Sequence, residues 1–160
     1  MSTSTLPDPS IYQSMRDSVL FSQPEGIGAT EVYAVLMDWH IGSGTASVLA
    51  AADGTASIYL SNGGGCIGGG DRLDEIREAA VNAVNLAAML FSRFERTESA
   101  GLPEPDEVGF FAMTGNGRYL ATAREDSLAA GTDPLCALGD AMQTIIAGYQ
   151  LISEDPPPSA

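Results

Sequence analysis

The 160-residue sequence contains no lysine, one histidine, one tryptophan and two cysteines. Its seven basic residues are all arginine, compared with 21 acidic residues, and the formal net charge is −14. Contact with nucleic-acid phosphates needs clustered basic side chains, so this composition argues against a nucleic-acid partner. It argues equally against an anionic membrane surface. The charge suits solubility, and it also suits capture of a protein partner with a basic surface, as in an acidic inhibitor or immunity-type protein.

The sequence also lacks a long apolar run and a leader-like start. No apolar run reaches the roughly 18 residues needed to span a bilayer, and residues 1–5 lack a basic stretch followed by an apolar core. We therefore expect a cytoplasmic protein. Cys66 and Cys136 are too few for a disulfide framework and have no metal-ligand spacing, so we expect free thiols, no metal and no cofactor.

The length matches one domain with one core. We expect a disordered N-terminus over residues 1–8, a single α+β domain over 9–153, and a disordered Pro-rich tail over 154–160.

The first half of the chain predicts one helix and three strands. Asp8 followed by proline resembles a helix cap, and apolar residues at helical spacing then predict a helix over 9–22. Strands are predicted over 31–40, 45–51 and 55–61, with the dipeptide Asp53-Gly54 turning the second strand into the third.

The second half predicts a long helix, a hairpin and a final helix. Asp71 with Asp74 resembles a capping box, and an apolar stripe continues from there to Phe94. A loop over 97–106 follows, because its glycine and prolines cannot continue the helix. Strands over 108–113 and 118–124, joined by Asn116-Gly117, precede a last helix that begins at Asp133-Pro134 and extends to Ile152.

The predicted order is α-βββ-α-ββ-α, which gives an α+β fold with an antiparallel sheet of about five strands and three helices. Phe110 and Phe111 place one ring on each face of their strand, so both faces of the sheet need cover. Because one chain has only three predicted helices, a second copy of the chain could cover one of the two sheet faces. We therefore expect a homodimer.

In this order of elements, the chain resembles the roadblock and profilin-like group of small scaffold and regulatory domains. The resemblance covers residues 9–152 and rests on element order, without a shared motif. It implies an α+β sandwich and a binding or regulatory role. The division into three and then two strands departs from the two-then-three division of that group.

A glycine run is the first candidate site, with six glycines in the eight positions 63–70. Gly63, Gly65 and Gly68 satisfy the pattern G-x-G-x-x-G between a predicted strand and a predicted helix. Asp71 and Asp74 in the following turn would repel a phosphate, and the preceding strand belongs to a meander. Two interpretations stay open, a close-packed corner and a small-molecule site. The candidate ligand-binding residues are Asn62, Gly63, Gly64, Gly65, Gly68, Gly69, Gly70 and Asp71.

The second candidate site is the strand end that contains Asp38, Trp39 and His40. Asp38 and His40 share a strand face, so the carboxyl group is able to orient the imidazole as a base for Cys66 or Ser61. The alternative is structural, with Asp38 and His40 stabilising a hairpin end and Cys66 filling apolar space.

Three functions follow from these observations. The first is a small non-enzymatic binding or regulatory module that acts through protein contacts as a homodimer. The second is a ligand-binding or hydrolytic protein whose site joins the glycine run to Asp38 and His40. The third is an acidic inhibitor that binds a basic partner.

Overall fold

The computed structural model describes residues 31–41, 44–60, 65–67, 74–98 and 106–154, and the single positions 17, 20, 26, 28, 101, 103 and 104. Three α-helices and a short 3-10 helix are present in this part of the chain: α2 (Asp74–Met89), η2 (Phe91–Arg93), α3 (Glu125–Ala130) and α4 (Cys136–Glu154). The strands are β1 (Val32–Ile41), β2 (Gly44–Ala51), β3 (Ala56–Leu60), β4 (Gly65–Ile67), β5 (Glu95–Thr97), β6 (Glu107–Thr114) and β7 (Gly117–Arg124).

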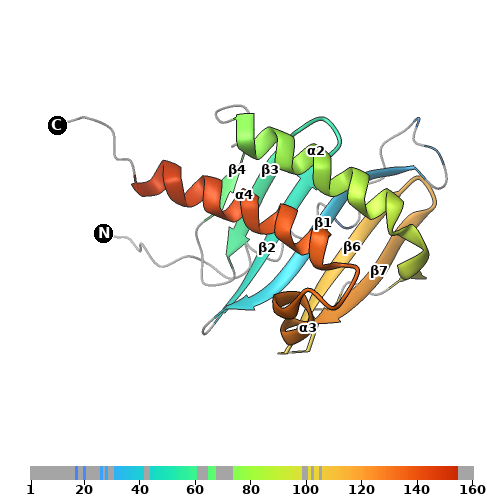
Figure 1. Cartoon of the computed structure of the whole chain (residues 1–160). Helices are drawn as coiled ribbons and strands as arrows, with labels where there is room; N and C mark the ends of the chain where they lie inside the picture. Colours follow the sequence, from blue (N-terminus) through green and yellow to red (C-terminus); the bar gives the residue numbers. More distant parts are fainter. Residues whose placement is uncertain are drawn as a thin grey trace, which may run out of the picture.

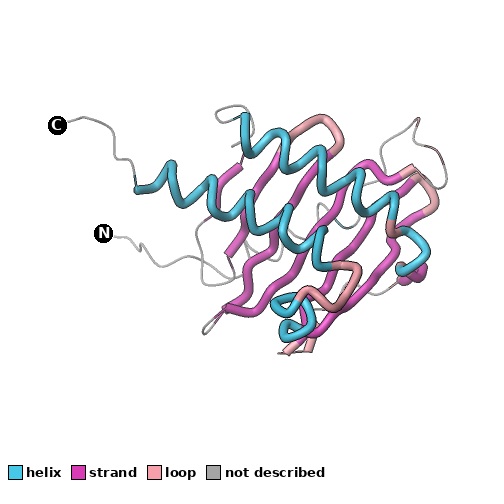
Figure 2. Tube along the Cα trace, in the orientation of Figure 1, coloured by secondary structure: helices cyan, strands magenta, loops and turns pink. Residues whose placement is uncertain are grey.

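The strands form one sheet in the order β4-β3-β2-β1-β6-β7-β5, and every neighbouring pair is antiparallel. The long helices α2 and α4 lie side by side across one face of this sheet (Figures 1 and 2). The fold is therefore α+β, as the sequence predicts.

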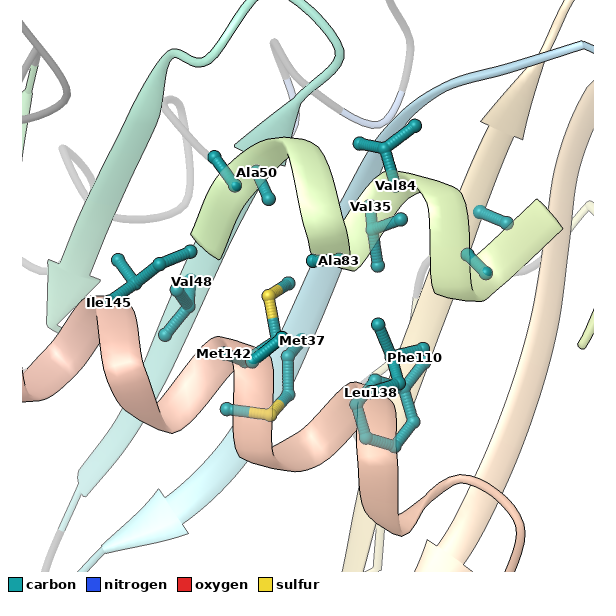
Figure 3. Close-up of a cluster of buried hydrophobic side chains, with 14 of the residues drawn as sticks. Val35, Met37, Val48, Ala50, Ala83, Val84, Phe110, Leu138, Met142 and Ile145 are labelled. Atoms are coloured by element: carbon teal, nitrogen blue, oxygen red, sulfur yellow. The ribbon is translucent and has the colours of Figure 1, made fainter. Parts of the chain in front are cut away.

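The main core lies between the sheet and the two long helices. Val35 and Met37 of β1 point into it, together with Phe110 of β6, and Met142 and Ile145 of α4 pack onto them (Figure 3). Small side chains of α2, including Ala83, let the helix approach the sheet closely.

A second apolar cluster lies on the opposite face of the sheet. It contains Leu36, which pairs with Phe111 of β6, and also Leu20 from the N-terminal part of the chain. Phe110 and Phe111 are both fully buried within a single chain. The expected cover on both faces is thus present, but a second copy is not needed to bury these two rings.

The structure corrects the predicted number and order of strands. The sheet has seven strands rather than about five, with four before α2 and three after it. β4 lies inside the glycine run, and β5 falls partly in the segment predicted as a loop. Each contains three residues, which is too short for an alternating pattern to be recognised. The predicted strands at β1, β2, β3, β6 and β7 are confirmed.

The helices also differ from the prediction. α2 ends at Met89 rather than continuing to Phe94, and the 3-10 helix η2 follows, where Phe91 makes an aromatic contact with Tyr119, with ring centroids 4.6 Å apart. The six-residue α3 was not predicted. The cap at Asp133 is confirmed, since its Oδ1 accepts the Leu135 N–H at 2.8 Å. The predicted helix over 9–22, apart from two positions, and the cap at Asp71 lie outside the described residues.

Candidate functional site

A cleft of about 260 Å³ is lined by residues of β1, β6, α3 and the first half of α4. Figure 1 shows α3 beside the start of α4. The floor of the cleft is apolar and comes from three different elements. Met37 of β1, Val108 of β6 and Leu128 of α3 line it, and the first two are almost fully buried. We call this the α3–α4 cleft. It brings together parts of the chain that are about 100 residues apart in the sequence.

Backbone geometry around α3 places this short helix at the cleft. The Glu125 N–H donates to the Asp106 carbonyl oxygen at 2.9 Å, which starts α3 directly after β7. Gly131 ends it with φ of +72° in the left-handed region, and its N–H donates to the Leu128 carbonyl oxygen. Glycine is the residue that adopts this conformation without strain, so the chain reverses here into α4.

Polar side chains stand at the rim of the cleft. Glu125 is half-buried, whereas Asp140 and Gln143 of α4 are exposed. Cys136, Asp140 and Gln143 lie at positions i, i+4 and i+7 of α4 and therefore share one side of the helix. Among the residues that line the cleft, none is basic.

Trp39 connects the sheet to this rim. The alternation that turns Met37 toward the helices does the same for Trp39, which packs against the main core. Its Nε1–H donates to Glu125 Oε1 at 3.3 Å, which holds the carboxyl group at the cleft.

The thiol of Cys136 ties α3 to α4. It donates to the Leu128 carbonyl oxygen at 3.3 Å, and Asp140 Oδ2 lies 3.9 Å from the sulfur. No histidine or second cysteine lines the cleft. A neighbouring histidine or cation activates a thiol nucleophile, and the residues that line this cleft include neither.

Asp38 and His40, the sequence-predicted candidates, lie on the other face of the sheet from the α3–α4 cleft. Asp38 is fully buried, and its Oδ1 accepts the Ser47 hydroxyl at 2.6 Å. The His40 ring donates from Nε2 to the Pro103 carbonyl oxygen at 2.8 Å, and Nδ1 lies 3.2 Å from Thr45 Oγ1. Both ring nitrogens are therefore engaged within the chain.

The structure does not bring Cys66 to His40. The backbone of Cys66 pairs with Ile58, which in turn pairs with Val48, and Val48 pairs with Met37 on β1. Three steps between neighbouring strands separate β4 from β1, about 14 Å in all. This exceeds the reach of a general base toward its nucleophile.

The glycine run is described only in part. Gly65 belongs to β4, whose three residues form an edge of the sheet beside β3. The other candidate positions lie outside the described residues: Ser61, Asn62, Gly63, Gly64, Gly68, Gly69, Gly70 and Asp71.

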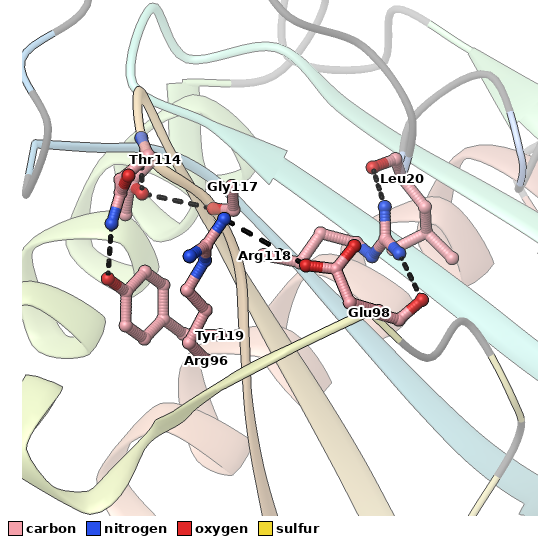
Figure 4. A network of polar contacts seen from close by, with 8 residues as sticks. Leu20, Arg96, Glu98, Thr114, Gly117, Arg118 and Tyr119 are labelled. Carbon is pink, nitrogen blue, oxygen red and sulfur yellow. Dashed lines mark hydrogen bonds and ion pairs between the residues drawn. The ribbon is translucent and has the colours of Figure 1, made fainter.

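Another polar network joins β7 to more distant parts of the chain (Figure 4). Arg118 donates to the Leu20 carbonyl oxygen at 3.1 Å and to the Glu98 carbonyl oxygen at 2.6 Å. Arg96 forms an ion pair with Glu98 at 3.8 Å. Because Arg118 bonds to backbone carbonyls, this network holds the chain together rather than offering the guanidinium to a ligand.

Sequence reasoning singled out Trp39 but missed Glu125, Cys136, Asp140 and Gln143 as members of a site. The one available signal was their spacing on the predicted last helix, which places Cys136, Asp140 and Gln143 on one side. Nothing local indicated that this side faces Trp39, because α3 was not predicted.

Within the described residues, no three His, Cys, Asp or Glu side chains come together to hold a metal ion. None of the helices in the described part of the chain is both long and apolar enough to cross a membrane. Comparison with known protein families, with curated proteins and with solved structures found no match.

Proposed function

We propose that this chain is a small non-enzymatic binding module that recognises a protein partner with a basic surface. The observation that carries the proposal is the distribution of charge over the helices. Exposed carboxyl groups of all three helices form what we call the helical acidic surface: Asp74, Glu75 and Glu78 of α2, Asp126 of α3 and Asp140 of α4.

The helical acidic surface is continuous with the α3–α4 cleft. Glu75 and Glu78 line a groove of about 340 Å³ between α2 and α4, and Thr144 lies on its far side. Thr144 donates to the Asp140 carbonyl oxygen one turn earlier, and Asp140 stands at the rim of the cleft. A partner that covers α2 and α4 would therefore contact both features.

Three of the described arginines form ion pairs outside this surface, and the side chain of Arg77 on α2 lies against Gly54 and near Asp53 in the turn between β2 and β3. Arg93 pairs with Asp133, Arg96 with Glu98 and Arg124 with Asp106. None of these pairs involves a carboxyl group of the helical acidic surface. Unneutralised carboxylates attract basic proteins over roughly a Debye length, about 8–10 Å at physiological salt.

The resemblance to roadblock and profilin-like domains is compatible with a binding role, although the four strands before α2 depart further from that group. The alternative of a ligand-binding or hydrolytic site at the glycine run with Asp38 and His40 has less support. His40 is engaged with Pro103, and Cys66 is three strands away.

Binding of an arginine-rich decapeptide and of a glutamate-rich decapeptide, measured by calorimetry at several salt concentrations, tests the proposal. We expect binding of the basic peptide alone, with an affinity that falls as salt rises. Glu75→Gln with Glu78→Gln should lower the affinity about twofold to fivefold per carboxylate, the range for exposed ion pairs.

Glu95→Gln with Glu104→Gln, at two exposed residues outside the helical acidic surface, removes the same charge and is the matched control. An equal loss of affinity in both double variants would mean attraction to net charge alone and would contradict the proposal. So would binding that is indifferent to salt.

A further inference from the structure

We propose that the α3–α4 cleft receives a single arginine side chain of the basic partner. This inference rests on the proposed function and specifies how the partner would be recognised. The size of the cleft, its two kinds of lining and the charge at its rim support it.

The size of the cleft favours one side chain as its occupant. Its volume of about 260 Å³ lies below the roughly 300–1,000 Å³ of pockets that enclose drug-sized ligands. Asp140 and Gln143 both line the cleft and are exposed to solvent, so a side chain from a docked protein has access to it.

The lining matches the two parts of an arginine side chain. Met37, Val108 and Leu128 offer an apolar floor for the methylene stem. Glu125 and Asp140 stand at the polar end, where a guanidinium group would form charge-assisted hydrogen bonds. No basic side chain lines the cleft to oppose a cation.

Trp39 adds a reason to favour arginine over lysine. Its indole lines the cleft and already holds Glu125 through the 3.3 Å hydrogen bond. A guanidinium is planar, weakly hydrated and able to stack on an aromatic ring while it bonds a carboxylate, whereas an ammonium is a strongly hydrated point charge.

The single tryptophan makes the test direct, because all indole fluorescence of the chain comes from Trp39. The probes are three glycine-rich pentapeptides with arginine, citrulline or lysine at the centre. Citrulline keeps the shape of arginine and lacks its charge. We expect a saturable fluorescence change with the arginine peptide, none with citrulline, and at least threefold weaker binding of lysine.

Asp140→Asn keeps the size of this exposed side chain and removes its charge. We expect it to weaken binding of the arginine peptide about threefold to tenfold. Glu125→Gln should act in the same direction. Glu95→Gln, which removes one exposed acidic charge from β5 outside the cleft and outside the helical acidic surface, is the matched control and should change the affinity less than twofold. Unchanged urea midpoints would verify that the variants fold.

Equal responses to arginine and citrulline would overturn the proposal, and so would equal effects of Asp140→Asn and Glu95→Gln. Equal binding of lysine would overturn the choice of arginine. Salt-dependent binding of the arginine-rich decapeptide that ignores Asp140→Asn would leave the proposed function intact and reject the cleft. A failure of both the decapeptide and the pentapeptide would reject both.

Discussion

At the scale of single residues, hydrogen bonds within the chain indicate structural roles for Asp38 and His40. Asp38 is fully buried and accepts a hydrogen bond from Ser47 on the neighbouring strand. A polar group removed from water costs free energy unless partners replace the water. The pair therefore stabilises the pairing of β1 with β2 within the sheet.

Ser47→Ala removes the hydroxyl that donates to Asp38. We expect the free energy of unfolding to fall by about 1–3 kcal/mol, because a buried carboxyl oxygen loses a donor. Urea denaturation followed by circular dichroism measures this. Ser92→Ala, at an exposed serine of η2, is the control and should change stability by less than about 0.5 kcal/mol. Equal effects of the two changes would show that the hydrogen bond contributes nothing.

A second residue-scale prediction concerns Asp53 in the β2–β3 turn. The backbone N–H and the hydroxyl of Thr55 donate to the carboxylate and lower the pKa of Asp53 below its ordinary value of 3.8. The unfolded chain thus holds the proton more tightly, so the stabilisation is present above pH 3.8 and is lost as pH falls through the lowered pKa.

Asp53→Ala should lower stability at neutral pH by less than about 1 kcal/mol, because the side chain is exposed and solvent screens it. The difference between the wild-type protein and the variant should vanish well below pH 3.8. Urea midpoints measured across the acid range check this. A difference that persists at the lowest pH would contradict the assignment.

At the scale of secondary-structure elements, the residues of the turn stabilise the β6–β7 hairpin. The predicted dipeptide Asn116-Gly117 ends the turn, and Gly117 has φ of +116°. Thr114 supports the turn by accepting the Asn116 N–H at 3.1 Å and donating to the Gly117 carbonyl oxygen at 3.0 Å. The conformation at Gly117 is one that residues with a Cβ rarely adopt.

Gly117→Ala should lower the free energy of unfolding by about 1–3 kcal/mol through backbone strain. Gly115→Ala, two residues earlier in the same turn, is the matched control, since Gly115 does not have a positive φ. Chemical denaturation of both variants provides the comparison. If Gly115→Ala were equally harmful, the effect would not arise from the left-handed conformation.

Local patterns predicted the longer elements and missed the short ones for a physical reason. β1 and α4 contain enough residues for alternation or helical periodicity to appear, and both are confirmed. β4, β5 and α3 exist because longer neighbours offer them hydrogen-bond partners. Such dependence on the neighbouring element is invisible in a short stretch of sequence.

Net charge acts at the scale of the whole molecule. The chain has 21 acidic and seven basic residues, so its carboxylates repel one another in the folded state and lower its stability. Salt screens this repulsion. We expect the melting temperature to rise between low salt and 0.3 M sodium chloride, with about 1 kcal/mol corresponding to roughly 2–4 °C. Binding of the basic peptide should weaken over the same range. A melting temperature that falls with salt would contradict the role assigned to repulsion.

Self-association is the remaining prediction at this scale. The sequence suggested a homodimer because both sheet faces need cover, and one chain supplies the cover for Phe110 and Phe111. Among the described residues, Met89 is the large apolar side chain that stays exposed, at 78 %. Light scattering at micromolar concentration should give twice the chain mass of 16.6 kDa if the homodimer forms. A strict monomer would reject it.

The α+β class, the five longer strands, the Asp133 cap and the acidic character of the protein can all be predicted from the sequence. These features depend on local periodicity, turn chemistry and composition, which neighbouring residues carry without reference to the rest of the chain. The folded structure was needed to show that Cys66 and His40 lie three strands apart and that Trp39 bonds to Glu125 in a cleft that Asp140 also lines. Strand order and helix docking depend on contacts between distant segments, and the candidate site is made of such contacts.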